Sequence, residues 1–242
     1  MMRKMWVWIL VTISLVWVND WYGGCYGCLE EERISLLEIK ASFDPFCMDS
    51  GVLRDWVDNK EKFGNCCEWP GIQCDESTKR VTQISFTDPN PYEPYCSRGW
   101  ILNASLFLPF QELQTLDLRR TGLVDCFKNE GFEVLSSTLK KLEVLDLSDN
   151  LFYNRPLSLN GLSSLKSLDL STNGLTESGF EVMSSNLRKL EHLDLSYNEF
   201  NDRILSCLSR FSSLKSLNLS GNYLLSGSTD ISGKVVNLSH EN

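Results

Sequence analysis

The sequence predicts an α/β solenoid, a right-handed superhelix of short coils whose parallel strands form one concave β-sheet, with a helical, disulfide-stapled cap at its N-terminal end. Three observations favour this class. A leucine pattern recurs five times between residues 113 and 222, the spacing within each copy is that of a strand, and a helical, cysteine-containing segment precedes the series. The 242 residues are enough for such an elongated array.

The recurring pattern has leucine at its first, fourth and sixth positions and, in four copies, asparagine at its ninth. The copies are LQTLDLRRT (113–121), LEVLDLSDN (142–150), LKSLDLSTN (165–173), LEHLDLSYN (190–198) and LKSLNLSGN (214–222). Their starts lie 29, 23, 25 and 24 residues apart, and VTQISFTDP (81–89) is a degenerate earlier copy. The two-residue step between the fourth and sixth positions indicates a strand, whereas a helical hairpin, the alternative, prefers steps of three and four.

This pattern and its period are the signature of leucine-rich repeats. Each copy is then one coil, and its strand directs leucines into a core shared with the neighbouring coils. The ninth residue is expected to satisfy backbone groups that the turn leaves unpaired, because an asparagine amide carries both donors and an acceptor. Asn150, Asn173, Asn198 and Asn222 fill this place, and Thr121 fills it less completely.

Residues 1–27 have the layout of a secretory signal peptide. Arg3 and Lys4 form a basic start, an apolar run follows from Met5 to Val18, and small residues come next at 23, 24 and 27. A membrane anchor is the alternative, but this run is short of the roughly 20 residues that a span needs. We expect a secreted, extracellular chain with no membrane span once this segment is removed.

Residues 28–80 are predicted to form the cap, beginning with a helix in CLEEERISLLEIKASF (28–43). Two apolar stripes run along opposite sides of this helix, so we expect it to be covered on both sides. The stripes are Ile34, Leu37 and Ala41 on one side, and Leu36, Ile39 and Phe43 on the other.

The chain contains nine cysteines, which in an exported protein indicate disulfides. Adjacent cysteines rarely bond to each other, so Cys66 and Cys67 should have different partners. We assign Cys28–Cys66 and Cys67–Cys74. A zinc site is the rival interpretation, but no histidine lies near. The sequence leaves the pairing of four others open, namely Cys47, Cys96, Cys126 and Cys207.

Several motifs together resemble the N-terminal cap of plant extracellular leucine-rich repeat proteins. They are the helix at 28–43, a stretch through Trp56, CCEWPGIQC (66–74) and RVTQISF (80–86). LNASLFLPFQELQTLDL (102–118) resembles one subgroup, the plant receptor-like proteins that lack a kinase domain. The resemblance supports the two assigned bridges. It implies a curved ectodomain that recognises extracellular peptides, microbial molecules or wall fragments and signals with partner receptor kinases.

The sequence also departs from that family. Residues 81–225 carry one degenerate and five clear repeats, whereas the family usually has many more repeats, a C-terminal cap, a membrane helix and a short tail. Residues 226–242 are predicted to be an unpatterned tail that leaves the last coil uncapped. We therefore expect a truncated product or gene fragment, and a plasma-membrane location if a longer product carries the helix.

Residues between the leucines are expected to lie on the concave face, because side chains alternate along a strand. The aspartates of the LDL motifs should stack in one column, which is either a site for a cation or basic peptide or, more simply, a row of solvated carboxylates. The candidate ligand contacts are Arg119, Arg120, Asp146, Asp149, Asp169, His192, Asp194 and Tyr197.

Composition and motifs exclude several function classes. The net charge of −9 disfavours nucleic acid and anionic membranes as partners. Only two histidines occur, and no nucleophile motif, phosphate loop or HExxH is present, so we expect no enzyme, metal or cofactor. N-x-S sequons for glycosylation occur at Asn103, Asn218 and Asn237.

The sequence therefore indicates a non-enzymatic recognition module whose partners are an extracellular protein, peptide or carbohydrate ligand and a receptor-kinase co-receptor. Two alternatives stay open. One is a secreted inhibitor of a microbial wall-degrading enzyme on the same scaffold, and the other is a receptor fragment without function.

Overall fold

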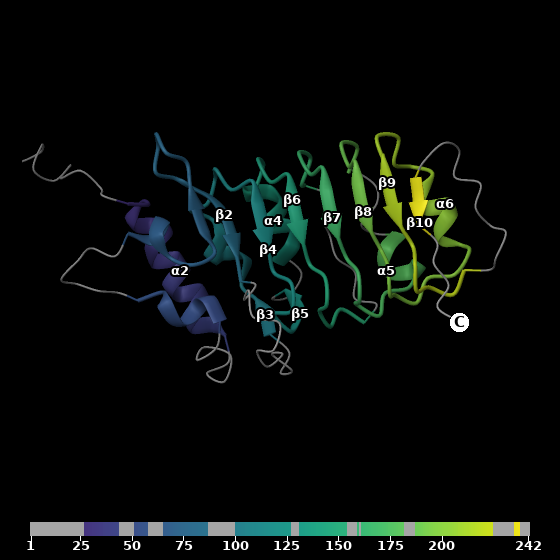
Figure 1. Ribbon diagram of the computed structural model, residues 1–242, viewed down its shortest axis with the longest axis horizontal. Helices are drawn as coiled ribbons and strands as arrows, with labels where there is room; N and C mark the ends of the chain where they lie inside the picture. Colours follow the sequence, from purple (N-terminus) through teal and green to yellow (C-terminus); the bar gives the residue numbers. More distant parts are fainter. Residues whose placement is uncertain are drawn as a thin grey trace, which may run out of the picture.

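One long β-sheet runs the length of the molecule, and the helices of the repeats lie behind it (Figure 1). The computed structural model describes residues 27–43, 51–57, 65–86, 100–126, 131–153, 159, 161–181, 187–224 and 235–237. The sheet has the order β1-β2-β4-β6-β7-β8-β9-β10, and all its neighbours are parallel except β1 and β2. A second, two-stranded parallel sheet pairs β3 with β5 at one edge of the coils.

The elements are short and regularly spaced. The strands of the long sheet are β1 Ile72–Cys74, β2 Val81–Ser85, β4 Thr115–Asp117, β6 Val144–Asp146, β7 Ser167–Asp169, β8 His192–Asp194, β9 Ser216–Asn218 and β10 Val235–Asn237. The second sheet consists of β3 Trp100–Leu102 and β5 Leu123–Cys126. The helices are α2 Glu30–Ser42, α4 Gly131–Thr138, α5 Glu177–Glu181 and α6 Ile204–Leu208, with 3-10 turns η1 Gly51–Asp55, η2 Cys66–Glu68 and η3 Ala104–Phe107.

The central leucine of each strand pairs in register with that of the next, which confirms the predicted solenoid. Leu145 pairs with Leu168, and Leu168 pairs with Leu193. All three are at most 2% exposed. Because every coil supplies an equivalent leucine, one continuous apolar core extends through the coils.

The asparagines at the ninth position bond to two coils at once, as their amide chemistry predicts. The Asn198 Nδ2 donates to the carbonyls of Leu170 in the preceding coil, at 2.9 Å, and Leu195 in its own coil, at 3.1 Å. Its Oδ1 accepts from the backbone N–H groups of Asn173 and Leu175, at 3.1 and 3.0 Å. Asn150 and Asn222 bridge their coils in the same way. This ladder joins neighbouring turns through their buried backbone.

One rung of the ladder is incomplete. The Asn173 Nδ2 donates to Leu147 and Leu170, but its Oδ1 is the one buried side-chain acceptor without a partner among the described residues. Asn173 therefore makes fewer bonds than Asn198 at the same position of the repeat.

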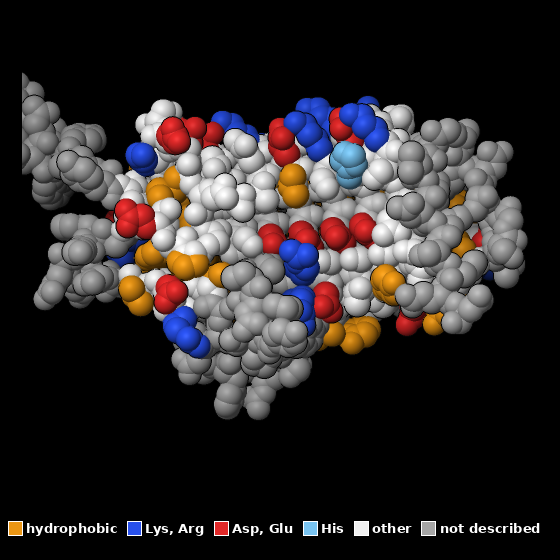
Figure 2. Space-filling model, viewed as in Figure 1, with side chains coloured by type: hydrophobic (Ala, Val, Ile, Leu, Met, Phe, Trp, Pro, Cys, Tyr) orange, Lys and Arg blue, Asp and Glu red, His pale blue; other side chains and the backbone are white. Residues whose placement is uncertain are grey.

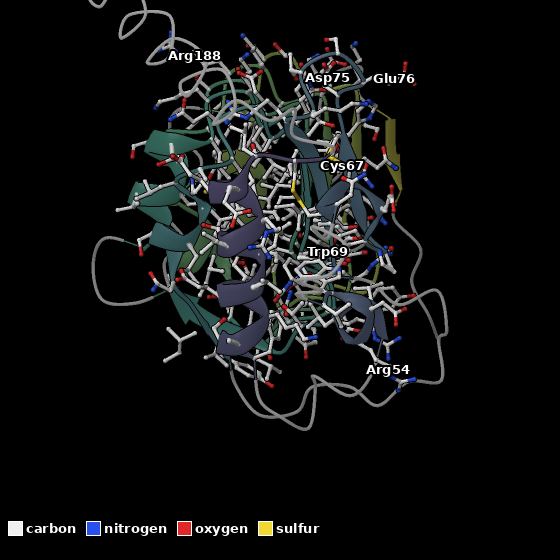
Figure 3. All side chains as sticks on the ribbon, turned by 90° about the vertical axis from the view of Figure 1, so that its left-hand side faces the viewer. Arg54, Cys67, Trp69, Asp75, Glu76 and Arg188 are labelled. Atoms are coloured by element: carbon white, nitrogen blue, oxygen red, sulfur yellow. A yellow bond between two sulfur atoms is a disulfide. The ribbon has the colours of Figure 1, made fainter. Side chains whose placement is uncertain are left out.

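The cap covers the N-terminal end of the sheet with one face of α2 (Figure 3). Leu36, Ile39 and Phe43 are buried, whereas Ile34 on the opposite stripe is 44% exposed, so the prediction of a helix covered on both sides is wrong. The buried face instead includes a charged residue, Glu32, which accepts from the first repeat position an N–H bond that in later coils goes to a carbonyl three residues earlier, as from Leu142 to Leu139. The Glu32 carboxylate accepts from the Val81 N–H and pairs with the Arg80 guanidinium at 2.8 Å.

Two disulfides and an aromatic cluster hold the cap together. Cys28 is bonded to Cys66 and Cys67 to Cys74, the pairing assigned from the sequence. In the same cap the rings of Trp56 and Trp69 stack with their centroids 5.8 Å apart. Cys67 and Trp69 lie beside α2 when the molecule is viewed from this end (Figure 3).

The C-terminal end differs from the sequence prediction. Residues 226–242 were expected to lack a pattern, yet Val235–Asn237 forms β10 and pairs in register with Ser216–Asn218 of β9. In sequence terms, Val236 and Leu238 occupy the fourth and sixth positions of a further copy, but glycine stands where its first leucine should be. Backbone pairing with β9 needs no leucine, which explains the extra strand.

Other predictions fall outside the described residues or stay open. The signal segment up to residue 26, and with it Cys25, lies outside them, as do Cys47 and Cys96. Among the described cysteines, Cys207 in α6 is a free, buried thiol, and Cys126 ends β5. Within the described ranges, none of the helices has the length and apolar character needed to span a bilayer.

We expect Asn198→Ala to destabilise the protein by about 3 kcal/mol or more, because it leaves several buried N–H and C=O groups unsatisfied at about 1–3 kcal/mol each. Asn173→Ala is the matched control and should cost less, since the Asn173 Oδ1 accepts no bond. Urea unfolding of the disulfide-bonded protein measures both. Equal losses of unfolding free energy in the two variants would show that the bonds accepted by the Asn198 Oδ1 contribute nothing.

Glu32→Gln should destabilise the protein by about 3 kcal/mol, because it breaks a buried charge pair with Arg80 and places an amide near the Val81 N–H. Glu30→Gln on the same helix removes an exposed pair with Arg33 and should cost less than about 1 kcal/mol. A shift in the thermal midpoint reads out each change. A Glu32→Gln protein as stable as Glu30→Gln would contradict this account of the cap.

Candidate functional site

The concave face consists of the residues that flank each central leucine. Asp117, Asp146, Asp169 and Asp194 pair in register and are followed by Asn218. In the space-filling view the carboxylates form a continuous acidic row along the middle of this face (Figure 2). The sequence prediction that these aspartates form one column is therefore confirmed.

The carboxylates also accept hydrogen bonds that close the turn at the end of each strand. The interpretation of the row as solvated charges did not predict these bonds. The Asp146 Oδ1 accepts from the backbone N–H of Ser148 at 2.9 Å and from its hydroxyl at 2.6 Å. The corresponding bonds recur at Asp169 and Asp194 with the serine two residues later. One oxygen of each carboxylate is thus committed to the turn, and the second lies toward the strand face.

At each end of the row, the carboxylate oxygen that is not bound by the turn has a side-chain partner. Arg119 lies between two carboxylates, with nitrogens 3.6 Å from Asp117 and 3.7 Å from Asp146. At the other end the Asn218 Nδ2 donates to the Asp194 Oδ2 at 2.8 Å. Asp169, between these ends, has a pKa raised above its usual value. Burial is the main cause, the neighbouring Asp146 and Asp194 charges add to it, and the hydrogen bonds from Ser171 oppose it.

The remaining candidate contacts lie at the edge of the acidic row. Arg120 pairs with Asp149 at 3.2 Å, and the His192 Nδ1 lies 3.3 Å from the Ser216 hydroxyl. Arg120, Asp149 and Tyr197 share the eighth position of the repeat, where the backbone adopts positive φ, between 52° and 57°. This conformation directs the chain into the asparagine turn, so the three residues serve the fold as well as the surface.

Two exposed tyrosines were missed by the sequence prediction. Tyr153 is 65% exposed and Tyr223 is 72% exposed, and both follow an asparagine turn, as Tyr197 precedes one. The rings of Tyr153 and Tyr197 pack on Gly174 and Gly221 of the next coil, where a Cβ would come within 3.1 and 2.6 Å of the ring. In the sequence Tyr153 lies three places after the ninth position, with Gly174 directly after the ninth position of the next repeat, and Tyr223 directly follows a ninth position.

The described residues contain no cluster of three or more metal-ligating side chains. The three sequon asparagines lie on different elements. Asn103 precedes η3 as its N-cap, and Asn218 and Asn237 belong to β9 and β10, where their backbones pair in register.

The repeats and the cap match known family models. A leucine-rich repeat N-terminal domain model matches residues 29–75, and leucine-rich repeat models match residues 161–184, 186–209 and 213–238. These matches coincide with the disulfide-bonded cap and with the coils that carry the asparagine ladder. The chain belongs to the leucine-rich repeat family.

Among leucine-rich repeat proteins, the chain is similar to plant receptor-like proteins. It is 35% identical over 170 residues to Receptor like protein 21 of Arabidopsis thaliana, over 66% of this chain and 17% of that protein. It is 36% identical over 172 residues to Receptor-like protein 15 of the same plant, over 68% and 17%, and 36% identical over 150 residues to Cuscuta receptor 1 of Solanum lycopersicum, over 61% and 13%. The chain thus spans about a sixth of the length of these relatives.

Solved leucine-rich repeat structures share the fold. The ectodomain of the plant membrane receptor kinase GASSHO1/SCHENGEN3 from Arabidopsis thaliana superposes with a TM-score of 0.51 at 22% identity, over 80% of this chain and 21% of that one. Pollen Receptor Kinase 3 gives a TM-score of 0.50 at 21% identity, over 78% and 82%. At this identity the likeness concerns the fold alone.

We expect Asp169→Asn to stabilise the protein at neutral pH by about 1 kcal/mol, the size of one solvated charge repulsion at this spacing. The new amide keeps the acceptor for Ser171 and supplies a donor to a neighbouring carboxylate, as Asn218 does. A raised folded-state pKa means that ionising Asp169 costs stability as pH rises past its unfolded value, near 3.8. The gain should therefore be present at neutral pH and disappear in acid.

Urea unfolding at several pH values tests this, with protein from a host that does not glycosylate, because the change creates an Asn-Leu-Ser sequon. Asp149→Asn, at the exposed edge, is the control and should show no such gain, since it removes the ion pair with Arg120. A gain at Asp169 that persisted unchanged in acid would contradict the electrostatic explanation.

Proposed function

We propose that this chain is an extracellular recognition module that binds a peptide, microbial or wall-derived ligand on its concave face and signals with a partner receptor kinase. The proposal rests on one observation: different residues of each repeat form the core and face the solvent. The leucines and asparagines form the core and join the coils, and the flanking residues, which bond the strand ends and turns, also present charge and aromatic rings to solvent.

The surface chemistry supports binding of a protein or peptide rather than nucleic acid. The row of four carboxylates and the chain's net charge of −9 repel polyanions. Arg119 lies between two of these carboxylates, and the rings of Tyr153 and Tyr197 are exposed; arginine and tyrosine are enriched at the energetic centres of interfaces. The similarity to receptor-like proteins also supports a binding function, and on the same basis we propose an extracellular location.

We expect Arg119→Ala combined with Tyr197→Asn to weaken ligand binding by about tenfold or more, since one interface contact of about 1.4 kcal/mol accounts for that factor. Asparagine tolerates the positive φ at position 197, so the fold should be kept. Arg210→Ala, an exposed arginine after α6, is the matched control and should leave affinity unchanged.

The assay has two steps. The immobilised secreted protein first retains peptides and oligosaccharides from extracellular fluid, which are identified by mass spectrometry. Each synthetic compound is then titrated against the wild type and both variants. A ligand whose affinity falls in the concave variant alone supports the proposal. Saturable binding that depends only on Arg210, or no saturable binding of any retained compound, would reject it.

A further inference from the structure

The first two sequons lie in different parts of the fold. Asn103 follows β3 at the edge of the coils, in the part of the molecule where the short second sheet lies (Figure 1). Asn218 belongs to β9, the next-to-last strand of the concave sheet, and has β8 on one side and β10 on the other. The sequence motif is the same at both places, so any difference in modification must come from the surroundings.

The carboxamide nitrogen of Asn103 is available for modification. Its Oδ1 accepts from the Ser105 N–H at 3.2 Å and from the Ser105 hydroxyl at 2.7 Å, which holds the start of η3. Its Nδ2 donates to no group in the described part of the chain, and Ser105 is exposed. A substituent on this nitrogen leaves the hydrogen bonds of the turn intact.

The nitrogen of Asn218 is already in use. Its Oδ1 accepts from the Ser220 N–H and hydroxyl at 3.2 and 2.8 Å, the same turn as at Asn103. Its Nδ2, however, donates to the Asp194 Oδ2 at 2.8 Å. Leu219 and Ser220 are 1% and 8% exposed, and the adjacent strands lie only about 4.8 Å away on either side.

N-glycosylation forms a bond from this nitrogen to C1 of an oligosaccharide. The donor is a polyprenyl diphosphate oligosaccharide, its C1–O bond to the diphosphate breaks, and the nitrogen loses one proton. A glycan on Asn218 would replace one hydrogen of the donor to Asp194. It would also place a bulky group over the neighbouring strands when the coils stack. A glycan on Asn103 meets neither obstacle.

We propose that the folded, secreted protein carries an N-glycan at Asn103 and none at Asn218. The carbohydrate is then confined to the edge of the coils, and the strand face from Asp117 to Asn218 stays bare. The role of that bare face as a docking surface rests on the proposed function, whereas the assignment of the two sites does not.

The test uses the full chain secreted from plant cells and purified as a folded monomer. A peptide N-glycosidase in heavy-oxygen water converts each glycosylated asparagine to labelled aspartate, and peptide mass spectrometry reads the label. We expect the label at Asn103 and not at Asn218. Label at Asn218, or an unlabelled Asn103, would overturn the assignment.

A matched pair of variants checks the result independently. Asn103→Asp and Asn218→Asp each remove the nitrogen and keep the oxygen that accepts from the serine. Asn103→Asp should lose the mass of one glycan, and Asn218→Asp should lose none while lowering the thermal midpoint, because the new carboxylate faces Asp194. Loss of glycan mass in Asn218→Asp overturns the proposal. No ligand enters either measurement, so failure of the proposed function would leave this result untouched.

Discussion

The backbone of the turn that follows each strand is the constraint on which this structure depends. The strands of the coils are only three to five residues long, so few backbone groups are paired by the sheet itself, and the turn behind them lies against the leucine core. An asparagine amide satisfies donors and acceptors there together, and because it bonds to two coils it also fixes their spacing. Thr121 shows the limit of a smaller side chain, because its hydroxyl reaches Leu118 and the Asn150 Oδ1, and Asn150 supplies the remaining bonds to that turn.

The two ends of the described coils satisfy other backbone groups with different chemistry. At the first coil a buried carboxylate from α2 accepts from the Val81 N–H, whereas in the later coils the equivalent N–H donates to a carbonyl three residues earlier, as Leu142 does to Leu139. A carboxylate in that position needs a cation, which Arg80 provides. At the other end β10 pairs with β9 through backbone groups. The cap is therefore specific in its side chains, whereas the added strand needs only an extended backbone in register.

The sequence predicted those parts of the fold in which one side-chain type has one physical role. Leucines at strand spacing and asparagine at the ninth position gave the coil, the core and the ladder. The prediction failed where burial is decided by neighbours, as for the second apolar stripe of α2, where Ile34 stays exposed. It missed β10, because Gly233 breaks the leucine pattern that backbone pairing does not require.

The sequence predicted which repeat positions form the candidate site, but it did not predict how their side chains bond to one another. Strand alternation placed the aspartates in one column, but spacing alone does not indicate that one oxygen of each is bound by a serine. Nor does it indicate that Arg119 lies between two carboxylates. Tyr153 and Tyr223 lie outside the nine-residue pattern, and the ring of Tyr153 packs on Gly174 of the next coil.

The fifth position of the repeat shows how such a surface changes without disturbing its support. Aspartate and asparagine offer the same oxygen to the serine two residues later, so either residue completes the turn. They differ in the second terminal atom of the side chain, which is a charged carboxylate oxygen in aspartate and an amide nitrogen donor in asparagine. At Asp146, Asp169 and Asp194, where leucine and serine follow, exchange to asparagine also creates a sequon. A single substitution therefore alters the charge, cross-strand bonding and modification chemistry of one coil, and the ladder beneath it stays in place. The strand face can diversify coil by coil because the groups that hold the coils together lie elsewhere.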